Sequence, residues 1–232
     1  MLNERQIGRK LSYKMRKTTN ELYSAYLEDS NSALSDYDYN LACNYAKDIS
    51  KYPLYYVDRP GTTDEIKDTI SYFQQVFSDK WLIVILDHTL LTRGKSGLSE
   101  REVLSDLEKV FMEAKKIGST TILQLSQMNR EIESVDRLNN ISMHYPMRRD
   151  IFGGESLFQA SDYVLVLHRP EILGITAYGL SKLPVKDMIY MHCLKAREGE
   201  PKVLSFINNL KYNSIEEADV STIKTKENND EK

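Results

Sequence analysis

The chain has 232 residues, of which 41% are hydrophobic and 28% are charged, and its formal net charge at neutral pH is −3. This is the composition of an ordinary globular protein, and it gives no overall attraction to nucleic acid. No apolar run approaches the ~20 residues of a membrane span, and the N-terminus lacks a signal-peptide core. Cys43 and Cys193 form no C-x-x-C motif, so neither a disulfide framework nor a zinc site is indicated. We expect a cytoplasmic protein without membrane contact.

The N-terminal quarter of the chain is expected to be mainly helical. Residues 1–28 carry an apolar side chain about once per helical turn, which predicts an amphipathic helix with a break near Thr18. Its basic residues could touch a phosphate backbone, although a solvated helix face is the preferred interpretation. A second helix is indicated around residues 37–49, and Leu54-Tyr-Tyr-Val57 predicts a short strand before the turn at Pro60-Gly61.

The run Trp81-Leu-Ile-Val-Ile-Leu-Asp87 predicts the central strand of the fold. Its six apolar residues show no polar alternation, which is typical of a strand covered on both faces in a parallel α/β sheet. An aspartate at the carboxyl end of such a strand lies where open α/β sheets bind ligands. Asp87 could hold a hydrated Mg²⁺ against a nucleotide phosphate, and the alternative is a capping aspartate that only ends the strand.

Helices and further strands are expected on both sides of this central strand. Capping-box spacings predict helices that open at Thr62 and at Ser99. The later elements expected in chain order are a helix end at Gly118, a strand over 120–125, a long functional loop over 131–150, a helix over 156–160, a strand over 163–167, hairpin strands over 188–194 and 203–207, and a charged, disordered tail over 217–232. This order predicts the α/β class, with a mainly parallel sheet and an antiparallel C-terminal hairpin.

Candidate functional residues follow three of the predicted strands. Asp87 ends the first, and Gln127 follows the second in the run Ser126-Gln-Met-Asn-Arg130, where an amide could contact a terminal phosphate or an attacking water. Lys195 and Arg197 lie two positions apart near the hairpin tip, so both cations project to one side. Such a pair could reach a nucleotide on a neighbouring subunit. Taken singly, a loop amide and two solubilising charges explain these residues as well.

Together, these motifs resemble the C-terminal, RecA-like motor domain of DnaB-type replicative helicases. That family has a strand ending in Ile-Asp, then Ser-Gln-Leu-Asn-Arg, an Asp-Leu-Arg…Ile-Glu-Gln-Asp-Ala-Asp segment, and Lys-x-Arg. The segment Leu54–Thr63 also matches the family's strand followed by Pro-Gly-Leu-Thr, and the resemblance extends over about residues 1–210. The counterparts in this chain are Ile85-Leu-Asp87, Ser126-Gln-Met-Asn-Arg130, Asp150-Ile…Leu157-Phe-Gln-Ala-Ser-Asp162 and Lys195-Ala-Arg197.

The resemblance implies an ATP-driven motor that forms a homo-hexamer on single-stranded DNA. By this resemblance, Asp87 binds Mg²⁺ through water, Gln127 senses the γ-phosphate of ATP, and Arg197 with Lys195 acts on ATP of the adjacent subunit. The loop over 131–149 is expected to contact DNA phosphates. Its candidate residues are Arg137, Arg148 and Arg149, although nearby acidic residues dilute their charge.

Two departures from the family pattern affect these expectations. The arginine of Asp-Leu-Arg is replaced in Asp150-Ile-Phe152, and no Gly-x-x-x-x-Gly-Lys-[Ser/Thr] phosphate loop occurs in the chain. We therefore expect residues 1–216 to be a partial motor domain that lacks the phosphate-loop strand and begins just after the family's Leu-Glu. A separate chain carrying the Walker A segment is an expected partner. Alone, the chain is expected to hydrolyse ATP negligibly and to aggregate through unpaired strands and a bare apolar face.

Three functional hypotheses follow. The first is the C-terminal part of a helicase motor that couples ATP hydrolysis to translocation on single-stranded DNA and to duplex unwinding. The second is a non-catalytic RecA-like remnant that binds DNA or a helicase subunit. The third, a recombinase or clock-type RecA relative, is disfavoured by the combination of Ser-Gln-x-Asn-Arg with Lys-x-Arg. Retention of Asp87, Gln127, Lys195 and Arg197 favours the first over the second. The four histidines have no ligand spacing, and Ser126 lacks the context of a hydrolase nucleophile.

Overall fold

The structure is a computed structural model that describes residues 3–23, 34–58, 61–89, 92, 94 and 97–219. The chain divides into two compact units, the first comprising residues 1–59, 186–189 and 205–232 and the second residues 60–185 and 190–204. No helix within the described ranges is long and apolar enough to cross a membrane.

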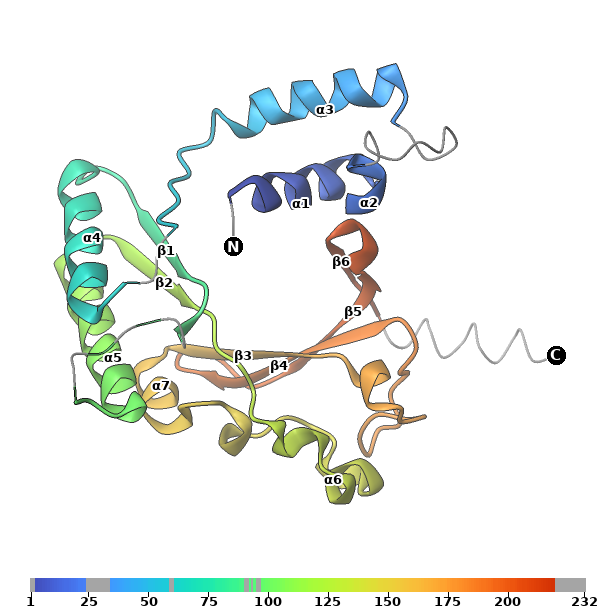
Figure 1. Cartoon of the computed structure of the whole chain (residues 1–232). Coiled ribbons are helices and arrows are strands. Elements are labelled where there is room, and N and C mark those ends of the chain that lie inside the picture. The colour runs from blue at the N-terminus through green and yellow to red at the C-terminus, as the bar shows by residue number, and fades with distance from the viewer. Residues whose placement is uncertain are drawn as a thin grey trace. The chain divides into compact units, whose positions relative to one another are not determined.

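Helices and strands alternate through the middle of the chain, and strands dominate its C-terminal part (Figure 1). The helices are α1 (Asn3–Met15), α2 (Thr19–Leu22), α3 (Asp36–Ile49), α4 (Thr63–Val76), α5 (Glu100–Ile117), α6 (Val135–Asn139) and α7 (Gly154–Ala160). The strands are β1 (Leu82–Leu86), β2 (Thr120–Gln124), β3 (Tyr163–His168), β4 (Met188–Ala196), β5 (Val203–Asn209) and β6 (Ser214–Glu217). Short 3₁₀ turns are η3 (Arg130–Glu133), η4 (Ile141–Met143), η5 (Arg148–Asp150), η6 (Pro170–Leu173) and η7 (Leu210–Tyr212).

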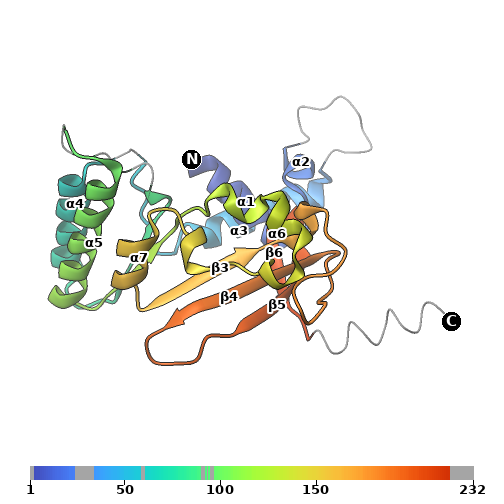
Figure 2. The ribbon, with the colours of Figure 1, turned by 90° about the horizontal axis from the view of Figure 1, so that it is seen from below.

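The second unit contains a parallel strand pair covered by two helices. β1 and β2 pair in register from Leu82 opposite Thr120 to Leu86 opposite Gln124. Helices α4 and α5 lie side by side over this pair, and α7 lies against α5 (Figures 1 and 2). Their buried residues form the main apolar core: Ile70, Leu107, Phe111 and Ala114, packed against Leu82, Val84, Leu86 and Ile122 of the strands. Both helices begin with the predicted capping boxes, at Thr62 and Ser99.

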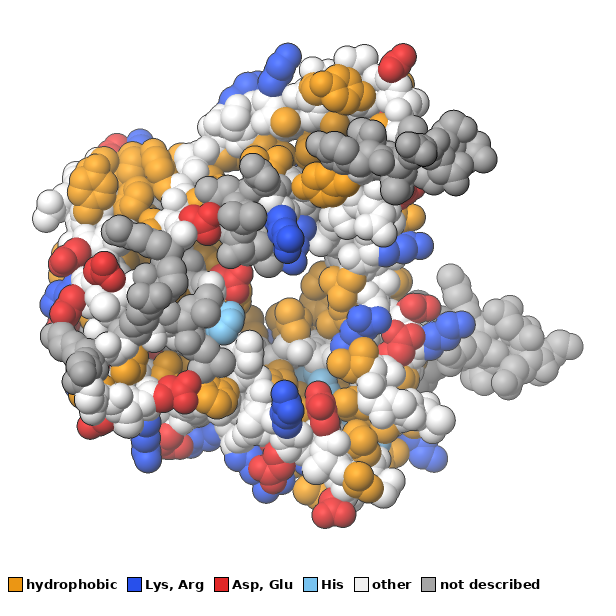
Figure 3. Space-filling view, in the orientation of Figure 1, with side chains coloured by type: hydrophobic (Ala, Val, Ile, Leu, Met, Phe, Trp, Pro, Cys, Tyr) orange, Lys and Arg blue, Asp and Glu red, His pale blue; other side chains and the backbone are white. Residues whose placement is uncertain are grey.

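The other face of the parallel pair carries exposed apolar side chains. Ile83 and Ile85 are 61% and 60% exposed, and Leu123 on β2 is 47% exposed. Trp81 also lies exposed, and its indole N–H donates to Thr121 Oγ1 across the pair at 2.9 Å. The expectation that β1 is covered on both faces is therefore wrong for the described residues, whereas the expected bare apolar face is present. Hydrophobic side chains also reach the surface over α3 and over α4 (Figure 3).

The remaining strands form a separate antiparallel sheet in the order β3-β4-β5-β6. Within the second unit, β3 pairs antiparallel with β4, from Tyr163 opposite Ala196 to His168 opposite Tyr190. The strands expected after residue 80 are thus confirmed, and so is the mixed α/β class. The parallel part is smaller than expected, because β3 joins the antiparallel sheet.

The first unit contains helices α1, α2 and α3 together with the later part of β5, which pairs antiparallel with β6. Ser12 on α1 is fully buried and accepts a hydrogen bond from Asn213 Nδ2 at 3.0 Å. Arg16 pairs with Glu216 of β6 at 2.9 Å, which ties α1 to that strand. The expected break near Thr18 is confirmed, because Thr18 caps α2. The end of the predicted first helix and most of the expected tail lie outside the described residues.

Two expectations about irregular segments were wrong. No strand forms over residues 54–57, where all four side chains are exposed. The predicted loop over 131–150 instead contains α6 and three 3₁₀ turns. At its end, Gly153 adopts a left-handed φ of 70°, and a Cβ there would lie 2.4 Å from the Leu104 side chain. Glycine is therefore required at this turn into α7.

Candidate nucleotide and nucleic-acid site

Asp87 and Gln127 follow the two parallel strands and lie at the same edge of the pair. Two backbone hydrogen bonds keep the strand ends together beyond the pairing itself: Leu125 N–H donates to Leu86 O at 3.0 Å, and Thr89 N–H donates to Leu125 O at 3.1 Å. The side chains of Asp87 and Gln127 are exposed, and the peptide bond between Asp87 and His88 is cis. A carboxylate and an amide are thus presented at the edge where parallel sheets bind ligands.

The Ser126–Arg130 motif is held by the backbone of residues 149–152. Phe152 N–H donates to Gln127 O at 3.0 Å, and Asn129 N–H donates to Asp150 O at 2.7 Å. The Asn129 amide Nδ2 also donates to Arg149 O at 2.7 Å. The asparagine of the motif therefore joins the strand end to the arginine-bearing segment, a role that the sequence analysis did not assign.

Arg137 is buried and does not face solvent. Its guanidinium donates to Asp150 Oδ1 at 2.5 Å, to Met143 O at 3.0 Å and to Tyr145 O at 2.9 Å, and only 2% of its side chain is exposed. Asp150 is fully buried and also accepts Met147 N–H at 2.7 Å. The expected contact between Arg137 and DNA phosphates does not fit this position, because its donors already bond to the segment over 143–150.

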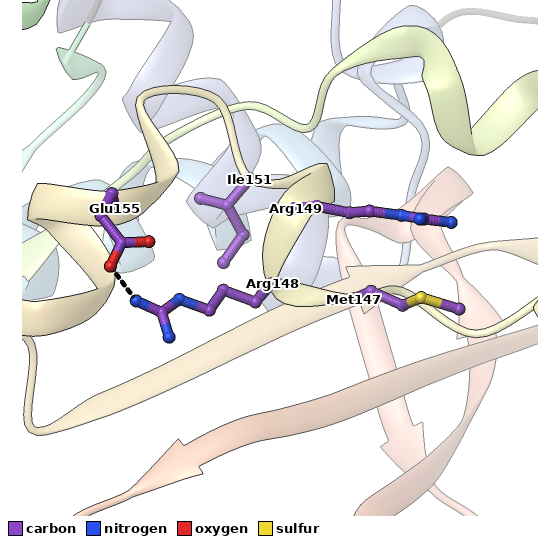
Figure 4. A pocket seen from close by; sticks show the side chains of 5 residues that line it. All are labelled: Met147, Arg148, Arg149, Ile151 and Glu155. Atoms are coloured by element: carbon purple, nitrogen blue, oxygen red, sulfur yellow. Dashed lines mark hydrogen bonds and ion pairs between the residues drawn. The ribbon is translucent and has the colours of Figure 1, made fainter.

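Arg148 and Arg149 are exposed and line a hollow of about 570 Å³ together with Met147, Ile151 and Glu155. Arg148 turns toward α7, where it pairs with Glu155 (Figure 4). Its guanidinium carbon lies 4.5 Å from the centre of the Phe158 ring. Arg149 points the other way (Figure 4). Of the three arginines expected to contact DNA, these two are accessible to a phosphate.

Lys195 and Arg197 lie at the end of β4, where both contact residues near the end of α7. Lys195 Nζ donates to Phe158 O at 2.7 Å and to Gln159 O at 3.0 Å. The Arg197 guanidinium pairs with Asp162 at 2.8 Å and remains 59% exposed. Asp162 also pairs with Lys115 of α5. Asp162 belongs to a family motif in the sequence, but the motif alone gave no signal of this contact.

A buried cluster of aromatic and imidazole rings lies against β3 and β4. The Tyr178 hydroxyl is hydrogen-bonded to His168 Nδ1 and to His192 Nε2, each at 2.6 Å, and Tyr145 packs against Tyr178. Burial lowers the pKa of both histidines to about 4. The spacing of the histidines along the chain gave no signal for this cluster, which depends on antiparallel pairing of β3 with β4. No cluster of three or more His, Cys, Asp or Glu side chains that could hold a metal ion occurs in the described part of the chain.

Known proteins that share the fold or the sequence pattern identify the class of protein to which the chain belongs. Two solved structures share the fold over 94% of this chain with a TM-score of 0.76: a DnaB-like replicative helicase, described with its interactions with primase, at 17% identity, and a second protein's ATPase domain at 18% identity. The sequence model of the DnaB-like helicase C-terminal domain matches residues 2–217. The chain belongs to this family. The resemblance seen in the motifs is thereby confirmed.

The chain matches only part of each relative. It covers 49% of the DnaB-like helicase structure and 72% of the second structure, which is called the solved ATPase domain below. The replicative DNA helicase DnaB of Mycobacterium leprae (strain TN) is 29% identical over 141 residues, which are 60% of this chain and 22% of that protein.

Proposed function

We propose that this chain forms the C-terminal part of a hexameric motor that couples ATP hydrolysis to translocation on single-stranded DNA and to duplex unwinding in the cytoplasm. The observation that carries the proposal is the shared edge of β1 and β2, where Asp87 and Gln127 are both exposed. The exposed Arg197 guanidinium adds a cation that a neighbouring subunit's nucleotide could meet. These residues supply part of the chemistry that phosphoryl transfer requires.

The exposed residues fit ATP and Mg²⁺ as ligands. The Asp87 carboxylate would hold Mg²⁺ through water, and the Gln127 amide would hydrogen-bond the terminal phosphate. Mg²⁺ commonly keeps several waters and one or two carboxylates, so a single carboxylate is an adequate protein ligand. When bound, the ion neutralises charge on the phosphates. Arg148 and Arg149 would contact the DNA backbone, and Arg137 would hold their segment in place.

The motor requires a phosphate loop, which the 232 residues do not contain. We infer that a polypeptide carrying Gly-x-x-x-x-Gly-Lys-[Ser/Thr] packs on the exposed face of β1 and β2. The apolar side chains of Ile83, Ile85 and Leu123 support this inference, because a strand face of this kind is normally covered. β1 and β2 also pair only with each other among the described strands, which leaves each with an unpaired edge.

A chimeric motor tests the proposal. The matching region of the solved ATPase domain is replaced by this chain, so that the relative supplies the phosphate loop, and ATPase is measured with and without single-stranded DNA. We expect DNA-stimulated turnover that Gln127→Ala and Arg197→Ala each abolish or lower strongly, since a trans-acting arginine contributes about 10³-fold or more to kcat.

The matched control is Lys202→Ala, which removes an exposed cation of the same hairpin and should change kcat little. Equal effects of Arg197→Ala and Lys202→Ala would contradict the assignment of Arg197. A folded chimera that binds single-stranded DNA without turnover would favour the non-catalytic binding module instead.

A further inference from the structure

The two cations at the end of β4 are held by their own chain in different ways. Arg197 makes two contacts with Asp162: its backbone N–H donates to Asp162 O at 2.9 Å, and its guanidinium pairs with Asp162 Oδ1 at 2.8 Å. The other carboxylate oxygen of Asp162 pairs with Lys115 of α5. The main chain of Arg197 is thus fixed independently of its side chain.

The ion pair of Arg197 is exchangeable. The Arg197 side chain is 59% exposed and that of Asp162 is 32% exposed, and ion pairs this open to solvent are weak. A phosphate carries more charge than a carboxylate and presents oxygens that a guanidinium can bind in pairs. The guanidinium can therefore leave Asp162 for a phosphate while the backbone bond keeps the hairpin in place.

Lys195 is held more firmly than Arg197. Its ammonium donates to two carbonyls at the C-terminal end of α7 and lies 5.4 Å from the centre of the Phe158 ring. The carbonyl end of a helix carries partial negative charge, which favours a cation there. Lys195 therefore fastens the tip of the β4–β5 hairpin to α7, and of the two cations Arg197 is the one placed to move.

Resting on the function proposed above, we propose that Asp162 is a positioning residue for Arg197. The Arg197 guanidinium pairs with the Asp162 carboxylate until a nucleotide phosphate of the neighbouring subunit takes the place of that carboxylate. Asp162 sets the phosphate concentration at which Arg197 is released, and Lys195 keeps the hairpin aligned during the exchange. The Lys115 ammonium, followed by Arg197 and Lys195, holds the pKa of Asp162 below its ordinary value. The carboxylate therefore competes for Arg197 throughout the neutral range.

The exchange can be measured on the whole chain without any helicase activity. Inorganic pyrophosphate is titrated into ¹⁵N-arginine-labelled protein, and the Arg197 side-chain signals are followed by NMR. We expect Asp162→Asn to lower the pyrophosphate concentration at half-maximal shift by about fivefold, because the competing carboxylate charge is gone.

The control is Glu198→Gln, which makes the same charge change at the next residue, whose side chain forms no hydrogen bond or ion pair with the Arg197 guanidinium in the structure. It should move the midpoint by less than about twofold, since the charge is exposed and screened. Equal midpoint changes in the two variants would overturn the proposal. So would an Arg197 signal that pyrophosphate does not shift in either the parent or the Asp162→Asn chain.

A second readout uses the chimeric motor. Asp162→Asn should lower the ATP concentration at half-maximal rate, whereas Arg197→Ala should lower kcat. A purely structural role for Asp162 predicts the reverse for Asp162→Asn, namely a lower kcat with no gain in apparent ATP affinity. A chimera without turnover would count against the proposed function, while the pyrophosphate titration would still decide the role of Asp162.

Discussion

At the scale of single residues, the buried pair of Arg137 and Asp150 organises the arginine-bearing segment. Asp150 is fully buried, and its carboxylate is shared between the Arg137 guanidinium and Met147 N–H. Arg137 extends the network to two backbone carbonyls. Removing one partner of such a pair leaves an uncompensated charge in the interior, which is costly.

We therefore predict that Arg137→Met destabilises the protein strongly. The free energy of unfolding should fall by about 3–5 kcal/mol, as for other buried pairs that lose one member. Urea unfolding followed by circular dichroism measures the change. The control is Arg149→Met, which removes an exposed arginine of the same segment and should cost less than about 0.5 kcal/mol. Similar losses in the two variants would show that the Arg137 contacts do not stabilise the fold.

The imidazoles of His168 and His192 make stability depend on pH. The pKa of His168 is lowered from 6.5 to about 4, mainly by burial. The nearby Arg137 and His144 also lower this pKa, and the Asp150 carboxylate opposes them. Burial, and to a smaller extent the nearby His168, also lowers the pKa of His192 to about 4. At pH values between about 4 and about 6.5, the unfolded chain binds more protons than the folded chain. The contribution of the two histidines to the free energy of unfolding is therefore complete above about pH 6.5 and is lost as the pH falls toward about 4.

We expect each of these histidines to lower the free energy of unfolding by about 2 kcal/mol between about pH 7 and about pH 5. Urea midpoints at the two pH values measure the loss. The double variant His168→Asn/His192→Gln should show a shallower dependence, whatever its absolute stability. Glu108 works in the opposite direction, because burial raises its pKa and folding then favours its protonated form. An unchanged pH dependence in the double variant would exclude the two imidazoles as its cause.

At the scale of elements, locally determined features could be predicted best from the sequence. The capping boxes at Thr62 and Ser99 and the interruption at Thr18 depend on residues three positions apart, and the structure contains all three. The shared edge of Asp87 and Gln127 was also predictable, because it follows from strand order alone. Such signals need no knowledge of distant packing.

Features that depend on distant packing could not be predicted. A bare apolar face was expected from the missing phosphate loop, but the unbroken apolar run of β1 carries no alternation, so it does not reveal that Ile83 and Ile85 are the residues on that face. The segment over 131–150 lacks an apolar period because a buried ion pair organises it, as Arg137 shows. Asp162 became part of the site only through antiparallel pairing of β3 with β4.

Helix α7 links the two groups of cations through one aromatic ring. Phe158 lies 4.5 Å from the Arg148 guanidinium carbon and 5.4 Å from Lys195 Nζ, measured to the ring centre. A partly exposed cation over a ring contributes about 0.5–1 kcal/mol. We predict a coupling of that size between Phe158→Leu and Arg148→Met in a double-mutant cycle of unfolding free energies.

The matched cycle pairs Arg148→Met with Phe111→Leu, which changes an aromatic residue of the main apolar core. Its coupling should be near zero, because Phe111 packs among apolar residues of α4, α5, β1 and β2. Equal coupling in the two cycles would mean that Arg148 acts on general stability instead of through the Phe158 ring.

At the scale of the whole molecule, the exposed apolar face of β1 and β2 leads to a prediction about how the chain behaves in solution. The face combines Ile83, Ile85 and Leu123 with the exposed indole of Trp81, and the two strands have no further strand partner among the described residues. Apolar strands with open edges associate with one another. In the absence of a phosphate-loop polypeptide, this face is available to a second copy of the chain.

We predict that Ile83→Thr/Ile85→Thr weakens self-association of the isolated chain by about tenfold or more, because each change removes apolar area from the contact while keeping a β-branched strand residue. Sedimentation velocity at several concentrations measures the effect. The control is Val76→Thr at the end of α4, an exposed apolar residue away from the strand face. The phosphate-loop region of the solved ATPase domain, added as a separate polypeptide, should suppress association of the parent chain in the same way. If Val76→Thr weakens association as much as the strand variant does, the chain associates through scattered apolar contacts and not specifically through the face of β1 and β2.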